Sequence, residues 1–208
     1  MPEPILFEFR KVAEADFPTE YGHFRIHGFE GGIDERRGAK REEAVVLVLG
    51  DVTTAEPVLV RIHSQCLTGD VFHSLRCDCR AQLELAMETI AGEGRGMVIY
   101  EKKEGRGIGL LNKLRAYELQ DAGADTIEAN EQLGFEADLR VYELPRSILR
   151  HFGVTAVRLM TNNPEKIAAL EAVGIAVTER VPCNAGRGRH SARYLWTKQK
   201  RMGHLLEL

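Results

Sequence analysis

Long apolar segments are missing from this sequence of 208 residues. No run approaches the roughly 18 consecutive apolar residues that a transmembrane helix requires, so we expect no membrane partner. The first residues, Met1-Pro2-Glu3-Pro4-Ile5, lack the basic stretch and apolar core of a secretory signal. We therefore expect a cytoplasmic protein.

The sequence also has little cysteine and no excess of positive charge. Four cysteines are too few for a disulfide scaffold. Lys and Arg together number 28 against 31 for Asp and Glu, which gives a net charge of −3. Nucleic-acid-binding domains are usually strongly basic, so we expect no nucleic-acid partner. Any anionic ligand must be held by a local cluster of arginines.

What is present is the composition of a globular protein, with 44% hydrophobic and 28% charged residues. Four segments with β-type patterns come first, at residues 5–12, 23–29, 44–49 and 58–63, and a turn-like cluster at 18–22 predicts a hairpin between the first two. A charged, glycine-rich loop is predicted at 31–38. Helical and strand patterns alternate from residue 83 onward. We predict a single α+β domain over residues 1–208, in which a β-rich N-terminal part packs with a β/α C-terminal part.

The later elements have clear local signals. A helix is predicted from Leu83 to Gly92, a strand at 96–100, and a helix at 110–122 with Leu111, Leu114 and Leu119 as core candidates. A strand at 156–160 precedes a helix that Asn163 can cap and Pro164 can begin. A strand at 175–181 and a closing helix at 192–206 complete the chain.

Three of the four cysteines form the pattern Cys66-x10-Cys77-x-Cys79. Three thiolates can bind Zn²⁺ and leave the fourth tetrahedral position to water, which is the arrangement of a catalytic site. There are two alternatives. One is a closed structural site completed by His63 or His73, and the simpler one is three unconnected buried cysteines. Charged residues surround Cys77 and Cys79, which disfavours an apolar core. The deaminase signature P-C-x-x-C is absent, because no second cysteine follows Pro182-Cys183.

A glycine-rich stretch from Glu104 to Lys113 follows the predicted strand at 96–100 and opens a helix. Glycines allow backbone N–H groups to approach an anion at a helix N-terminus. A tight turn without a ligand explains this stretch equally well. Basic residues near element ends could converge on phosphates, although each alone is more often a solvated charge: Arg61, Arg106, Arg140 and Lys166.

Several motifs together resemble one enzyme family, GTP cyclohydrolase II, which catalyses the first step of riboflavin biosynthesis. They occur in colinear order over nearly the whole chain: Arg61-Ile62-His63-Ser64-Gln65-Cys66-Leu67-Thr68-Gly69-Asp70, Ser74-Leu75-Arg76-Cys77-Asp78-Cys79, Glu104-Gly105-Arg106-Gly107-Ile108-Gly109-Leu110, Thr126-Ile127-Glu128-Ala129-Asn130, Leu133-Gly134-Phe135-Glu136-Ala137-Asp138-Leu139-Arg140 and Arg158-Leu159-Met160-Thr161-Asn162-Asn163-Pro164-Glu165-Lys166. The resemblance implies a homodimeric enzyme with one Zn²⁺ per chain and Mg²⁺ on the triphosphate. The implied reaction converts GTP to 2,5-diamino-6-(5-phospho-D-ribosylamino)pyrimidin-4(3H)-one, formate and pyrophosphate.

The resemblance also implies roles for individual residues. Cys66, Cys77 and Cys79 match the zinc ligands. Asp138 matches the proposed proton acceptor, Arg140 the proposed nucleophile toward the α-phosphate, and Tyr117 a tyrosine that assists opening of the imidazole ring. The positions that match GTP-binding residues are Arg61, Ile62, His63, Ser64, Gln65, Gln82, Glu104, Gly105, Arg106, Thr126, Thr161 and Lys166.

The sequence departs from the family pattern at three places. Gln65 stands where the family usually has glutamate, Arg80 stands where it usually has glycine, and residues 188–191 replace an asparagine-rich loop. Two other functions stay open: an enzyme of the same scaffold that stops at a formamidopyrimidine nucleotide, and a non-catalytic zinc-stabilised nucleotide-binding module. Tyr117 disfavours the first, and its occurrence together with Asp138, Arg140 and all three cysteines disfavours the second.

Overall fold

The computed structural model describes residues 7–33, 41–135, 142–185, 188 and 191–206. Within these ranges, seven strands form a single mixed sheet in the order β1-β2-β3-β5-β4-β6-β7. The antiparallel half comprises β1 (Phe7–Thr19), β2 (Gly22–Ile33), β3 (Glu42–Leu49) and β5 (Gly96–Glu101). The parallel half continues from β5 through β4 (Val58–Ser64), β6 (Ala156–Met160) and β7 (Ala176–Val181). The predicted α+β class is confirmed, and β5 joins the two halves.

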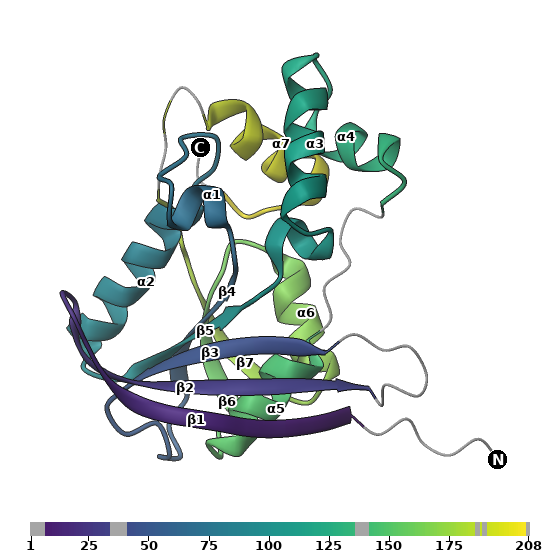
Figure 1. The fold of residues 1–208 in the computed structure, drawn as a ribbon. Coiled ribbons are helices and arrows are strands. Elements are labelled where there is room, and N and C mark those ends of the chain that lie inside the picture. The colour runs from purple at the N-terminus through teal and green to yellow at the C-terminus, as the bar shows by residue number, and fades with distance from the viewer. Residues whose placement is uncertain (1–6, 34–40, 136–141, 186–187, 189–190, 207–208) are drawn as a thin grey trace.

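The predicted hairpin is formed by β1 and β2, the long strands at the lower edge of Figure 1. Its turn is stabilised by Thr19, whose hydroxyl oxygen accepts hydrogen bonds from the backbone N–H groups of Tyr21 and Gly22 at 3.2 Å. β2 continues through Gly31 to Ile33. The start of the predicted glycine-rich loop is therefore strand, because these residues pair with β1, and the rest of that loop lies outside the described residues.

The helices are α1 (Leu67–Asp70), α2 (Cys79–Glu93), α3 (Leu110–Asp121), α4 (Thr126–Gln132), α5 (Glu143–His151), α6 (Pro164–Ala172) and α7 (Ala192–Met202), with a short 3₁₀ turn, η2 (Glu104–Gly107), before α3. Asn163 caps α6 as predicted, since its side-chain oxygen accepts from the backbone N–H of Glu165 at 3.1 Å. The predicted end of α2 at Gly92 was wrong by two residues. Gly94 adopts the left-handed conformation that ends this helix, with φ +68°.

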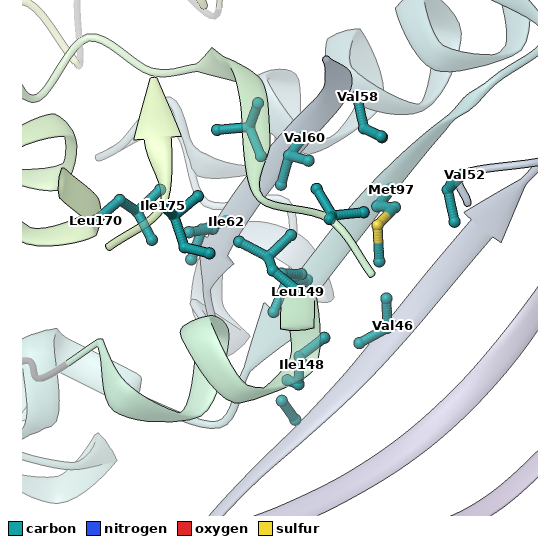
Figure 2. Close-up of a cluster of buried hydrophobic side chains, with 14 of the residues drawn as sticks. Val46, Val52, Val58, Val60, Ile62, Met97, Ile148, Leu149, Leu170 and Ile175 are labelled. Carbon is teal, nitrogen blue, oxygen red and sulfur yellow. The ribbon is translucent and has the colours of Figure 1, made fainter. Parts of the chain in front are cut away.

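Both faces of the central strands are buried. On one face, Val60 and Ile62 of β4 and Met97 of β5 pack against side chains of α5 and α6, including Ile148 and Leu170 (Figure 2). Alternate residues of a strand point to opposite faces, so the neighbouring residues Leu59 and Val98 contribute to a second cluster. That cluster includes Ala86, Met87 and Ile90 of α2. Burying each large aliphatic side chain stabilises the fold by roughly 1.5–3 kcal/mol.

The prediction that Leu111 and Leu114 belong to the core was wrong. Their exposed fractions are 73% and 45%, Leu119 is half-buried, and the buried residue of α3 is Ala116. The reason is the position of α3, which stands beyond the end of the sheet rather than on one of its faces (Figure 1). Among the described residues, no helix combines the length and apolar character needed to cross a membrane.

Candidate active site

The candidate site lies where three adjacent parallel strands end. Gln65 and Cys66 follow β4, Lys103 and Glu104 follow β5, and Thr161 follows β6. The carboxyl ends of parallel strands meet at one edge of a sheet, where ligands of open α/β sheets usually bind. A cavity at this edge is lined by most of the predicted site residues: Arg61, His63, Ser64, Gln65, Cys66, Cys77, Cys79, Gln82, Glu104, Gly105, Tyr117, Thr161 and Lys166.

The three cysteines predicted to bind a metal lie together. Their sulfur atoms are all within 4.8 Å of one another, and Cys66 Sγ is 3.7 Å from Cys77 Sγ. This geometry contradicts the alternative of unconnected buried cysteines. Cys66 directly precedes α1, and Cys79 is the first residue of α2, so two helix starts bring the sulfurs to one point.

No further histidine, cysteine or carboxylate joins this cluster among the residues that the structure describes. The imidazole of His63 lies 3.3 Å from the carboxylate of Asp70 and stacks on Tyr100 with ring centroids 5.4 Å apart. His73 contacts the guanidinium of Arg80. The arrangement therefore favours three protein ligands over a closed site completed by His63 or His73.

A glycine makes room for the sulfur atoms. A Cβ atom at Gly69, within α1, would lie 2.9 Å from Cys77 Sγ and 3.1 Å from Cys66 Sγ. Real Cβ contacts are essentially never shorter than 3.0 Å. The backbone of α1 thus passes directly against the cluster, and only glycine fits there without displacing a sulfur.

The charges around the cluster favour one ionised thiol in the metal-free protein. Hydrogen bonds from Cys77 and Cys79 and the nearby Lys113 ammonium lower the pKa of Cys66 far below its usual range. The same sharing of protons raises the pKa of Cys77 to about 11 and also raises the pKa of Cys79. Three clustered soft sulfur donors fit a thiophilic cation such as Zn²⁺, which replaces the shared protons as it binds.

Lys113 is a site residue whose role was not predicted. Its Nζ donates to Cys66 Sγ at 3.1 Å, to Thr68 Oγ1 at 2.9 Å and to Glu104 Oε1 at 2.6 Å. Burial alone lowers the pKa of Lys113, but the hydrogen bond to Glu104 and the charge of Cys66 outweigh burial and raise it. The sequence offered one signal for this role: Lys113 lies near the start of the helix that follows the glycine-rich stretch.

Glu104 and Tyr117 are each fixed by neighbours in the site. The second carboxylate oxygen of Glu104 accepts from the backbone N–H of Leu67 at 2.7 Å, so both oxygens are anchored. Tyr117, one helical turn after Lys113, has its hydroxyl 3.2 Å from Thr68 Oγ1 and its ring 4.8 Å from the Arg76 guanidinium. Burial raises the pKa of Tyr117, which keeps its phenol protonated.

A chain of buried polar side chains crosses the other side of the cavity. Arg61 donates to the side-chain oxygen of Gln82 at 2.6 Å and to the backbone oxygen of Met160 at 2.9 Å. The Gln82 amide nitrogen donates to Asp78, whose other oxygen pairs with Lys198 of α7 at 2.9 Å. Lys198 was missed because it lies 120 residues from its partner, with no local motif around it.

The phosphate-binding candidates near α6 are also buried. Lys166 Nζ donates to the backbone oxygen of Ile62 at 2.8 Å. The side chain of Ile62 lies fully in the core, so only its backbone belongs to the site. Asn163 lines the cavity, and its buried side-chain Nδ2 has no hydrogen-bond partner among the described residues.

Some predicted residues fall where the structure gives no description. Asp138 and Arg140 lie outside the described residues, and so do the side chains of Arg106 and Thr126. Among the departures from the family pattern, Gln65 lines the cavity, whereas Arg80 pairs with Glu84 at 2.7 Å.

A three-thiol cluster at the wall of a cavity with buried basic side chains is typical of a metal-dependent enzyme with an anionic substrate. Comparison with known families agrees. The sequence model described as GTP cyclohydrolase II matches residues 10–182, and the chain belongs to this family.

Two curated relatives match most of the chain. The chain is 57% identical over 195 residues to GTP cyclohydrolase-2 of Azotobacter vinelandii, covering 94% of this chain and 91% of the relative. It is 54% identical over 194 residues to GTP cyclohydrolase-2 of Saccharophagus degradans, covering 93% and 94%. A solved two-domain 3,4-dihydroxy-2-butanone 4-phosphate synthase from A. baumannii aligns at 16% identity with a TM-score of 0.43, over 87% of this chain and 40% of that one, which is too weak for any argument.

Proposed function

We propose that this protein hydrolyses GTP to 2,5-diamino-6-(5-phospho-D-ribosylamino)pyrimidin-4(3H)-one, formate and pyrophosphate, the first step of riboflavin biosynthesis. Family membership over residues 10–182 supports the reaction class. The observation that carries the proposal is the placement of three cysteine sulfurs, within 4.8 Å of one another, in the wall of the cavity that Glu104, Gln82 and Lys166 also line.

Cys66, Cys77 and Cys79 would hold one Zn²⁺ per chain. With zinc bound, these ligands would supply an activated water, whose pKa lies well below the value of about 15.7 for bulk water. Two hydrolytic cleavages of the guanine imidazole ring are needed to release formate. We assign to Tyr117, whose phenol is kept protonated by burial, the donation of a proton to the ring nitrogen as the ring opens.

Glu104 and Gln82 are proposed to bind the guanine base. Glu104 is anchored through both oxygens, and the remaining lone pairs can accept from the N–H groups of guanine. The amide of Gln82 is oriented by Arg61 and Asp78, which fixes where it can donate and accept. Polar groups that are preorganised in this way can bind a base without first changing their conformation.

We assign the triphosphate, with Mg²⁺, to five basic or hydroxyl-bearing residues: Arg61, Arg106, Thr126, Thr161 and Lys166. Residues 62–64 at the end of β4, Gln65 directly after it, and Gly105 in η2 are proposed to contribute to the same site. Asp138 is proposed as proton acceptor, and Arg140 as the residue that acts at the α-phosphate. Charge-assisted hydrogen bonds from Arg and Lys suit this ligand.

We further propose that residues 1–208 form a single domain that acts as a homodimer in the cytoplasm. The dimer is an implication of the family resemblance. Large exposed apolar side chains such as Phe72 and Leu75, with exposed fractions of 70% and 68%, would be covered more favourably in such an assembly than in water.

The test is a product assay with GTP, Mg²⁺ and zinc-loaded protein. Equal amounts of formate and pyrophosphate would support the proposal. Pyrophosphate with a formamidopyrimidine nucleotide but no formate would favour the truncated reaction, and bound GTP without products would favour the binding module. Cys77→Ser should abolish formate release. Cys183→Ala is the matched control, because this buried cysteine lies outside the sulfur cluster.

A further inference from the structure

The ammonium group of Lys113 occupies a central position among the groups of the site. An ammonium has three N–H donors, and Lys113 has three acceptors within reach: Cys66 Sγ, Thr68 Oγ1 and Glu104 Oε1, at 3.1, 2.9 and 2.6 Å. The side chain is largely buried, with an exposed fraction of 12%. Every donor is therefore matched by an acceptor of the protein.

Each acceptor belongs to a different part of the proposed machinery. Cys66 is a candidate metal ligand, and Glu104 is the candidate base-binding carboxylate. Thr68 leads to Tyr117, because its hydroxyl lies 3.2 Å from the Tyr117 hydroxyl. Lys113 can only donate, so Thr68 accepts from it and keeps its own hydrogen to give either to Tyr117 or to Cys66.

These groups come from separate segments of the chain. Cys66 and Thr68 lie at the start of α1 after β4, Glu104 lies in η2 after β5, and Lys113 lies in α3. A thiolate and a carboxylate within hydrogen-bond distance of one nitrogen would repel each other without the cation between them. An arginine carries the same charge, but its planar guanidinium cannot direct three donors from one atom.

We propose that Lys113 is the positioning residue of this site, holding Cys66, Glu104 and, through Thr68, Tyr117 in one fixed arrangement. The inference rests on the proposed function, because it assigns Glu104 to the base and Cys66 to the metal. It goes further in making metal retention and base recognition depend on the same side chain. Loss of Lys113 then weakens both, although it is expected to touch neither the metal nor the base.

The test compares Lys113→Met with Lys102→Met, a lysine of similar length whose side chain is 68% exposed and pairs with Glu43 at the surface. The first readout is zinc affinity, measured by competition with a chromophoric chelator. Lys113→Met should lower it by about 10–100-fold, as removal of groups bonded to metal ligands generally does. The second readout is the ratio of kcat/KM for GTP to that for inosine triphosphate, which lacks the 2-amino group. We expect Lys113→Met to reduce this ratio at least about fivefold. A Glu104 carboxylate that is no longer held in place would form a weaker hydrogen bond to the 2-amino group and would therefore distinguish the two substrates less.

Lys102→Met should match the wild type in both readouts. The proposal is overturned if Lys113→Met stays within twofold of the wild type in both, or if only one readout changes, since a common anchor must affect both. If Lys113→Met does not fold, Lys113→Arg replaces it, with the same two criteria. A wild-type protein that releases no formate from GTP would refute the proposed function instead, while the zinc readout would still test the contact of Lys113 with Cys66.

Discussion

The ammonium of Lys198 lies 2.9 Å from the carboxylate of Asp78, the residue between the candidate metal ligands Cys77 and Cys79. Both side chains are buried, with exposed fractions of 10% and 1%. This ion pair connects α7 to residues 77–79 at the start of α2, which carry two of the three sulfurs. It also orients Gln82, which shares the Asp78 carboxylate.

Breaking this pair should destabilise the fold and loosen residues 77–79, which carry two of the candidate metal ligands. Lys198→Met leaves the Asp78 carboxylate buried without its cation, which typically costs about 3–5 kcal/mol. Urea unfolding should show this loss, and the double variant Asp78→Asn/Lys198→Met should recover part of it. Glu56→Gln, which breaks the pair of the exposed Glu56 with Arg95, is the control and should change stability much less. Equal losses for the buried and the surface pair would contradict this account.

Gly69 and Gly92 provide a matched pair of glycine substitutions. Gly69→Ala would place a Cβ atom 2.9 Å from Cys77 Sγ, so a sulfur must move and zinc content per chain should fall. A Cβ atom at Gly92, which is exposed in α2, would have no neighbour within 4 Å in the described part of the chain. Gly92→Ala should therefore keep zinc and stabilise the protein by roughly 0.5–1 kcal/mol through helix propensity. Elemental analysis and thermal unfolding measure the two effects, and full zinc occupancy in Gly69→Ala would refute the close approach of α1.

Lys166 is expected to contribute to triphosphate binding. Lys166→Ala should weaken GTP binding by roughly 1.5–3 kcal/mol if the ammonium makes a charge-assisted phosphate contact. Calorimetry on protein stripped of zinc, with Mg²⁺ present, measures the Kd without turnover. Lys200→Ala, an exposed lysine of α7, should leave the Kd unchanged. An unaltered Kd in Lys166→Ala would place the phosphates elsewhere.

Arg140 distinguishes two chemistries at the α-phosphate. A guanidinium stays protonated in proteins and is a poor nucleophile, so we expect electrostatic stabilisation. Arg140→Lys should then retain measurable pyrophosphate release, and no covalent adduct should be trapped with α-labelled GTP. A stable labelled adduct that forms on Arg140 and is lost in Arg140→Lys would establish nucleophilic attack instead.

Stability should decrease as the pH falls below about 6.5 because of His27. This imidazole is buried against Phe152, with ring centroids 5.1 Å apart, and burial lowers its pKa below 6.5. The positive charges of Lys11, Arg25 and His151 lower the pKa of His27 further. The negative charge of Glu14 raises it, but only partly offsets the other effects. The unfolded chain therefore binds more protons than the folded protein below about pH 6.5. As a result, the free energy of unfolding decreases as the pH is lowered.

Urea unfolding between pH 7.5 and 5 measures this slope. His27→Gln should flatten it, whereas His23→Gln, at an exposed position on the same strand, should not. A slope unaffected by His27→Gln would assign the pH dependence to other groups.

The sequence determined the features that depend on neighbours along the chain. The hairpin of β1 and β2, the strand at Ala156–Met160 and the cap of α6 by Asn163 were all predicted, because turn chemistry, side-chain alternation and capping act within a few residues. The cysteine cluster was also visible, since its chemistry is specific and its spacing short. Two helices, α4 and α5, were not predicted. α4 is short, with seven residues, and α5 is as long as α6 but lacks the Asn-Pro start that marked α6.

The tertiary structure alone decided which distant residues share the site. The order of strands places β5 between β3 and β4, and this brings the ends of β4, β5 and β6 to one edge. Only there does Lys113 meet Cys66, and Lys198 meet Asp78 across 120 residues. It also left Leu111 of α3 exposed beyond the sheet, although its spacing favoured the core. Hydrophobic periodicity records that a residue can be buried, whereas strand order and helix placement determine what covers it.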